Sequence, residues 1–143
     1  MTHQLILTPL QVAVASLEAA IETPETGLSP LQENMRRDAI IQRFECTFEL
    51  CWKMMKRTIE QIGGREETDD LFSKKDLFRR AHEAALIKDP GAWFAYLLAR
   101  NQTSHAYDKK KAEAVHAKAI HFAIDARALL TKLEETYAPS HTS

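Results

Sequence analysis

The sequence predicts an all-α fold, an antiparallel four-helix bundle with one additional short helix. Apolar residues recur three and four positions apart over long stretches, a spacing typical of helices that bury one face. No stretch shows the alternation of Val, Ile and Thr that marks strands, and the chain holds only 4 Gly. Helices joined by connections of this kind pack most simply side by side in antiparallel order.

The first two predicted helices begin in the same way, with a capping residue, a proline and a glutamine three residues after the cap. Thr8 is the expected cap of the first helix, and Ser29 is that of the second. The second helix carries an apolar stripe over residues 41–62, and the glycine pair at 63–64 is expected to end it. The apolar stripe of the first helix consists of Leu10, Val14, Leu17 and Ile21.

The second half of the chain continues the helical pattern. Residues 65–72 form a polar connector, and Ser73 then opens a capping box for a short third helix. Asp89, which a proline follows, is the expected cap of a fourth helix that runs to about Asp108. A fifth helix is predicted to begin near Lys111 and to carry a long apolar stripe of its own.

The composition indicates one globular domain over residues 1–143, with 135–143 as a frayed tail. Apolar residues make up 45% and charged residues 27%, which excludes a disordered chain. The net charge of −1 excludes a bulk basic field, so any nucleic-acid site must be a local patch. No apolar run approaches the ~20 residues that cross a bilayer. Cys46 and Cys51 point about 140° apart on one helix, so we expect a reduced, cytoplasmic protein.

Polar residues gather at the end of the fourth predicted helix. With steps of ~100° per residue, four of them continue the apolar stripe of that helix, and two lie at its margin. Each buried polar group costs roughly 1–3 kcal/mol when it is unpaired, so the pattern predicts either a hydrogen-bonded network or a wet cleft. The four are Asn101, Ser104, His105 and Asp108, and the two at the margin are Arg100 and Tyr107.

These residue types suit phosphate chemistry. Arg100 is permanently charged and can bind phosphate through two hydrogen bonds. The imidazole of His105 can accept and donate a proton, so the pair fits metal-independent RNA cleavage. Tyr107 offers a hydroxyl that can act as nucleophile, hydrogen-bond donor or modification target. No zinc-type spacing or glycine-rich phosphate loop occurs, so we expect neither a metal site nor a cofactor.

Two neighbouring features leave alternatives open. Lys109, Lys110 and Lys111 form either a solvated helix junction or a basic patch that attracts phosphate to the cleft. Glu45 and Glu49, one turn apart on the second helix, either pair within that helix or contact Arg100.

Three segments carry a resemblance to known families. The segment RDAIIQRFECTFELCWKMMK (37–56) is similar to the RDAxIQRFEFTFELxWK signature of the nucleotidyltransferase substrate-binding protein family. The segment 73–93 is similar to the middle of that family's sequences. The run RNQTSHAYD (100–108) resembles the Arg-x4-His-x-Tyr motif of the HEPN superfamily, and within it the HepT-like proteins. The resemblance covers roughly residues 5–135.

The resemblance implies a HEPN-like homodimer whose two Arg/His motifs lie along a shared cleft. It also implies a minimal nucleotidyltransferase as partner, in a two-component module of the toxin–antitoxin type. HepT-like members are ribonuclease toxins that the partner neutralises by adenylylating the motif tyrosine. Carried over by position, Arg100, Asn101 and His105 are catalytic, and Tyr107 is the adenylylation site.

Other members of the family are read as non-catalytic subunits that hold a substrate for the transferase. The residues alone leave both functions open. In either case the cleft and RNA-contacting candidates beside the motif are Ser104, Asp108, Lys109, Lys110 and Lys111.

Overall fold

The described part of the chain is helical and contains no strand. In the computed structural model it comprises residues 6–63, 73–105 and 107–137. The all-α prediction is confirmed. The elements are α1 (Thr8–Glu22), α2 (Pro30–Gly63), α3 (Lys74–Glu83), α4 (Pro90–Asn101), the 3₁₀ turn η2 (Thr103–His105) and α5 (Lys109–Tyr137).

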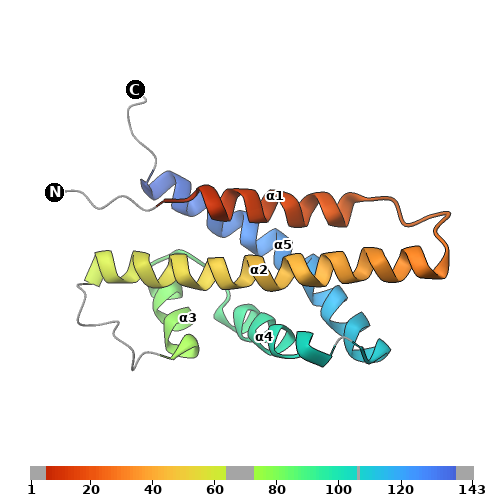
Figure 1. Ribbon diagram of the computed structural model, residues 1–143. Helices are drawn as coiled ribbons and strands as arrows, with labels where there is room; N and C mark the ends of the chain where they lie inside the picture. Colours follow the sequence, from red (N-terminus) through yellow and green to blue (C-terminus); the bar gives the residue numbers. More distant parts are fainter. Residues whose placement is uncertain (1–5, 64–72, 106, 138–143) are drawn as a thin grey trace.

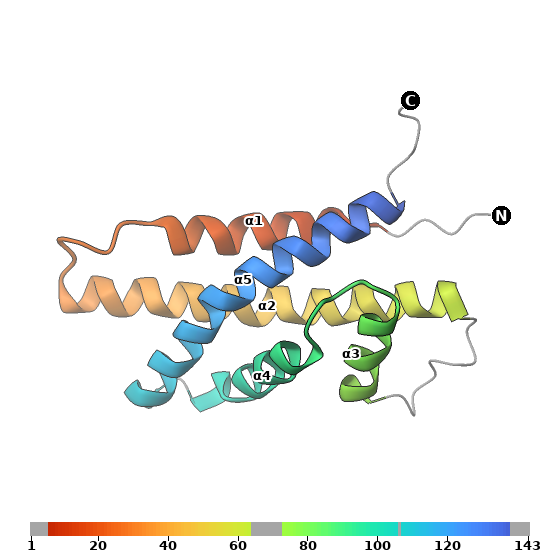
Figure 2. The same cartoon turned by 180° about the vertical axis from the view of Figure 1, so that it is seen from behind.

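The long helix α2 is the element against which α1, α3, α4, η2 and α5 all pack. Figure 1 shows α1 and α2 running in opposite directions side by side, with α5 crossing both at an angle. The reverse view in Figure 2 shows α3 and α4 on the side of α2 away from α1. Because α1, α2, α4 and α5 alternate in direction and α3 is short, the arrangement is compatible with the predicted bundle.

Three of the four predicted helix caps are formed. Ser29 and Gln32 bond reciprocally, each backbone N–H donating to the other side chain at 2.9 and 3.1 Å. Ser73 and Asp89 cap α3 and α4 through their side-chain oxygens. The cap predicted at Thr8 is wrong, because the partly buried Leu7 anchors the chain one residue earlier and places Thr8 inside the helix.

Helix α4 ends at Asn101, seven residues before the predicted end at Asp108. The Thr103 hydroxyl lies 2.8 Å from the carbonyl oxygen of Arg100 and competes there with the helical backbone ladder. The chain then makes the turn η2 before α5 begins at Lys109, two residues earlier than expected. The fourth helix is therefore short, and a turn separates most of the polar motif from it.

At its other end, α5 extends to Tyr137, so residues 135–137 are helical and not part of a frayed tail. The predicted connector 65–72, Gly64 and the tail residues 138–143 lie outside the described residues. None of the described helices is both long and apolar enough to span a bilayer.

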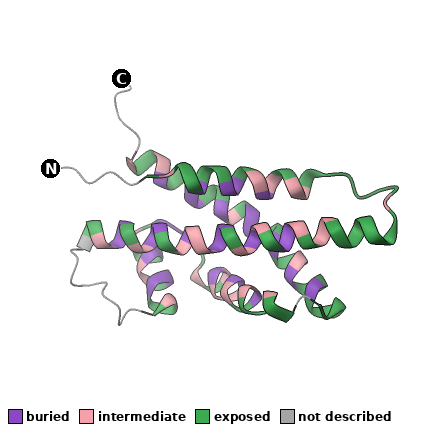
Figure 3. Ribbon diagram, in the orientation of Figure 1, coloured by how far each residue is buried: buried purple, intermediate pink, exposed green. Residues whose placement is uncertain are grey.

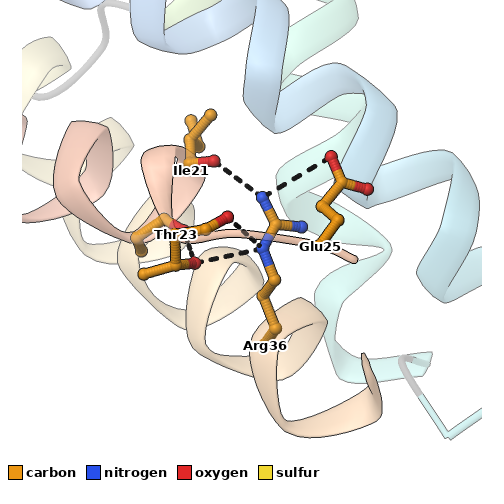
Figure 4. Close-up of polar contacts among 5 residues, drawn as sticks. Ile21, Thr23, Glu25 and Arg36 are labelled. Atoms are coloured by element: carbon orange, nitrogen blue, oxygen red, sulfur yellow. Dashed lines mark hydrogen bonds and ion pairs between the residues drawn. The ribbon is translucent and has the colours of Figure 1, made fainter. Parts of the chain in front are cut away.

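Arg36 of α2 holds the connection between α1 and α2, as Figure 4 shows. Its Nη2 donates to the carbonyl of Ile21 at 2.7 Å, and its Nε lies 3.2 Å from the carbonyl and 3.1 Å from the hydroxyl of Thr23. Its Nη2 also lies 3.9 Å from Glu25 Oε2. These contacts satisfy carbonyls that the end of α1 leaves without helical partners. The connection is thus tied to the start of α2.

An aromatic cluster fills the centre of the molecule, where the buried faces in Figure 3 meet. The ring of Phe48 on α2 lies within 6.3 Å of four other rings from α2, α3, α4 and α5. These rings belong to Phe44, Phe78, Trp93 and Phe122. Edge-to-face contacts between such rings add to the gain from burial. Phe48 therefore connects four of the five described α-helices.

We expect Phe48→Ala to lower the free energy of unfolding by about 3–5 kcal/mol, because it opens a cavity where four helices meet. Urea denaturation followed by circular dichroism measures this. The matched control is Ile124→Ala at a side chain that is 68% exposed, with an expected change within about 0.5 kcal/mol. A similar small change in both variants would contradict the central role of the cluster.

Candidate functional site

The site is built around an ion pair between α4 and α2. Arg100, one residue before the end of α4, places its Nε 2.9 Å from Oε2 of Glu49. The Nε atom is buried and its N–H points away from a good hydrogen-bond direction, so the contact is a charge pair rather than a directed hydrogen bond. The other carboxylate oxygen of Glu49 accepts a hydrogen bond from Trp52 Nε1 at 3.1 Å. Glu49 is thus fixed on one side while it holds Arg100 on the other.

A second carboxylate on α2 reaches the turn that follows α4. Glu45 Oε2 lies 3.1 Å from the hydroxyl of Thr103, which also approaches the carbonyl of Arg100. Glu45 and Glu49 are one helical turn apart and so face the same neighbour. Of the two alternatives for this pair, the structure shows the contact of Glu49 with Arg100. Thr103 is a site residue that the sequence analysis missed.

The remaining residues of the motif do not continue the buried stripe of α4. Ser104, His105 and Asp108 are exposed, and so is Asn101 at the last position of the helix. The prediction of a core stripe through residue 108 is wrong, because a 100° step applies only while the helix is unbroken. The polar run instead forms an exposed turn between α4 and α5.

His105 and Tyr107 lie close together in this turn. Their ring centroids are 6.2 Å apart, with the rings inclined at 61°. The Tyr107 side chain is 87% exposed. The sequence placed Arg100 and Tyr107 together at the margin of one stripe. In the structure their burial differs, because Arg100 is half-buried against α2 and Tyr107 projects into solvent.

Asp108 serves as the cap of α5. Its Oδ1 accepts hydrogen bonds from the backbone N–H groups of Lys110 at 3.0 Å and Lys111 at 3.3 Å. The side chains of Lys109, Lys110 and Lys111 are exposed on the first turn of this helix. Three ammonium groups at the positive end of a helix dipole raise the local positive potential. The junction is therefore basic even though Asp108 is part of it.

Two shallow hollows meet at Tyr107 and Asp38. One has a volume of about 300 Å³ and is lined further by Ile41, Gln42, Glu45 and Thr103. The other, which we name the α2–α5 hollow, has a volume of about 450 Å³. Besides Tyr107 and Asp38, it is lined by Pro30, Glu33, Asn34 and Arg37 of α2 and by Lys109 and Glu113 of α5.

A larger hollow of about 630 Å³ between α1 and α2 shares no lining residue with these two. Among the described residues, no three His, Cys, Asp or Glu side chains are grouped so as to hold a metal ion.

Comparison with known proteins identifies the family of the chain. The family model described as nucleotidyltransferase substrate binding protein like matches residues 5–135. A protein of Haemophilus influenzae named "Probable ribonuclease HepT" is 37% identical in an alignment of 140 residues that covers 94% of this chain and 96% of that protein.

Two solved structures share the fold. One, from Haemophilus influenzae, is described as the fold of a substrate binding domain of a nucleotidyltransferase. It superposes with a TM-score of 0.84 at 34% identity, over 90% of this chain and 99% of that one. A crystal structure from Thermus thermophilus gives a TM-score of 0.70 at 28% identity, over 87% and 98% of the two chains. The chain therefore belongs to the nucleotidyltransferase substrate binding protein like family.

Proposed function

We propose that this chain is the partner subunit of a minimal nucleotidyltransferase in a two-component module of the toxin–antitoxin type. In this proposal a homodimer of the chain cleaves RNA without a metal ion, and the transferase neutralises it by adenylylating Tyr107. The similarity to a protein named as a ribonuclease supports the activity, and the family description supports the partner. The observation that carries the proposal is that Glu49 holds the Arg100 guanidinium at the end of α4, while His105 and Tyr107 lie together in the exposed turn that follows.

The Arg100 guanidinium is suited to bind a phosphodiester. Glu49 pairs with the Nε atom of this guanidinium. In the described part of the chain, its two Nη groups make no hydrogen bond or ion pair. Two parallel N–H groups match two phosphate oxygens and stabilise the extra negative charge of a pentavalent phosphorus. Asn101 and Ser104, both exposed nearby in sequence, add neutral hydrogen-bonding groups.

His105 supplies the proton transfer. In the proposed reaction the ribose 2′-oxygen attacks phosphorus, its proton passes to a base, the bond to the 5′-oxygen breaks and that oxygen takes a proton. A single imidazole can take one of these roles at a time, and the second motif of the dimer supplies another. The exposed ammonium groups of Lys109, Lys110 and Lys111 attract the RNA backbone to this turn.

Tyr107 is the most exposed tyrosine in the described part of the chain, where Tyr137 is half-buried against the core. Tyr96 is buried, its hydroxyl donates to Asp125, and burial followed by this hydrogen bond raises the pKa of Tyr96. In adenylylation, Tyr107 Oη attacks the α-phosphorus of ATP, pyrophosphate leaves, and the phenolic proton is lost. The product places a bulky anion next to the His105 ring, where it repels RNA phosphates.

A second candidate function is a non-catalytic subunit that presents a substrate to the nucleotidyltransferase. The description of the Haemophilus influenzae structure as a substrate binding domain favours it, as do the two open hollows at Tyr107. In that case another molecule, and not Tyr107, receives the nucleotide.

The catalytic assignment predicts that the purified chain cuts RNA in the presence of EDTA. His105→Ala should then lower the cleavage rate by about 10²–10⁴-fold, because it removes the proton-transfer group. The unfolding curve should stay unchanged, because His105 is exposed. His121→Ala on the exposed side of α5 is the matched control and should cut normally. Equal cutting by the His105 variant would show that this residue is not catalytic.

The modification assignment predicts an added AMP group on Tyr107 after incubation with the partner transferase and ATP. Peptide mass spectrometry locates the group, and Tyr107→Phe, which lacks only the hydroxyl, should remain unmodified. Modified protein should also lose its ribonuclease activity. If Tyr107 stays bare while another molecule gains AMP, the substrate-presenting function is the correct one.

Glu49 is predicted to act as a positioning residue for Arg100. Glu49→Gln should lower kcat/KM for RNA by about tenfold to a hundredfold, because the guanidinium loses its charged support. The free energy of unfolding should fall by no more than about 1 kcal/mol, as for other half-exposed pairs. Glu60→Gln, which removes a comparable pair with Lys56 on α2, should leave the rate unchanged. An equal rate loss in both variants would argue for a general effect on α2.

A further inference from the structure

Tyr107 borders two hollows, and a group attached to its hydroxyl has both within reach. We propose that the α2–α5 hollow is the seat of the nucleotide that Tyr107 carries, with the phosphate held by Arg37 and Lys109. This inference rests on the proposed adenylylation. The inference adds a defined location for the AMP group, and this location gives a reason why the modification persists.

The charges of the residues that line the two hollows show which hollow suits a phosphate. The α2–α5 hollow has one cation from each helix, Arg37 of α2 and Lys109 of α5. The smaller hollow is lined by Asp38, Ile41, Gln42, Glu45, Thr103 and Tyr107, and none of these carries a positive charge. A phosphate with two carboxylates and no cation beside it is unfavourable. The phosphate therefore belongs in the α2–α5 hollow.

Arg37 has a donor to spare at this place. Its Nη2 donates to Asn34 Oδ1 at 2.8 Å, while its buried Nε finds no hydrogen-bond partner in the described part of the chain. Hydrogen bonds from a guanidinium to phosphate are among the stronger kinds. Because Nε is buried, a phosphate in the hollow would accept hydrogen bonds from the outer Nη groups of Arg37.

The carboxylates of the same hollow define which nucleotide it accepts. Glu33, Asp38 and Glu113 can accept hydrogen bonds from ribose hydroxyls and from the amino group of adenine. They also outnumber the two cations, so the inside of the hollow disfavours a small ligand with several negative charges, such as a triphosphate. An AMP group esterified to tyrosine is a diester with a single negative charge. Its charge and its donors fit this lining.

The size and position of the hollow agree with this occupant. Its volume of about 450 Å³ lies in the range of small-molecule sites, which is roughly 300–1,000 Å³. Tyr107 is part of its wall, so an ester on the hydroxyl begins at the rim and needs no movement of either helix. Once seated, the nucleotide would bridge α2 to the start of α5 and shield its phosphodiester bond.

The test uses the full chain, adenylylated by its transferase and checked by mass spectrometry. A phosphodiesterase that cleaves tyrosine–AMP esters is added, and the rate of AMP release is measured. We expect Arg37→Gln and Lys109→Gln each to release AMP about tenfold faster than the unmutated chain, because each loses a charged contact to the phosphate. Lys118→Gln, at an exposed position of α5 outside the hollow, is the charge-matched control and should behave as the unmutated chain.

A second measurement needs no variant and covers the case in which the substitutions prevent modification. In the unmutated chain, adenylylation should slow amide hydrogen exchange at residues 33–38 and 109–113. Unchanged exchange, or equal release from all chains, would overturn the proposed seat. Faster release only from Gln42→Ala would place the nucleotide in the smaller hollow instead and would also overturn it. Complete absence of AMP on Tyr107 is a different result, since it refutes the proposed function itself.

Discussion

The register of α2 is the constraint on which the rest of the structure depends. Phe48 must point into the aromatic cluster, since its ring meets rings from α3, α4 and α5. With Phe48 fixed, the helical step turns Glu45 and Glu49 together toward α4. Those two carboxylates contact Arg100 and Thr103, so they fix the position of the C-terminal end of α4 against α2. The same helix thus orders the core and supports the polar site.

The sequence predicted those parts of the fold that depend on local chemistry. The caps at Ser29, Ser73 and Asp89 are formed, because each side chain bonds a backbone N–H three residues away. Thr8 has the same local pattern, but the packing of Leu7 against the core starts the helix earlier. Packing against the core is a tertiary effect, so the local pattern around Thr8 does not reveal it. Local sequence patterns therefore predict that the helices exist, whereas tertiary packing also determines where a helix such as α1 begins.

The sequence predicted little of the geometry of the candidate site. The contact of Glu49 with Arg100 stood among the alternatives, because both residue types were present and charged. Thr103 and Glu45 lie 58 residues apart, and nothing in either segment marks their contact. For Asp108 a signal was present, since an aspartate directly before a helical run is a typical cap. The expectation that α4 continues through it concealed that role.

The early end of α4 gives the motif its chemical organisation. In an unbroken helix, Tyr107 would stand near Arg100 on the flank of the stripe, and the position of His105 would be in the core. Because the helix stops at Asn101, His105 and Tyr107 stand together in an exposed turn, while Arg100 stays anchored to α2. Under the proposed function, the group that moves protons and the group that is modified thus share one solvent-facing site. A single anion added there acts on both the approach of RNA and the proton-transfer residue, without any rearrangement of the helices.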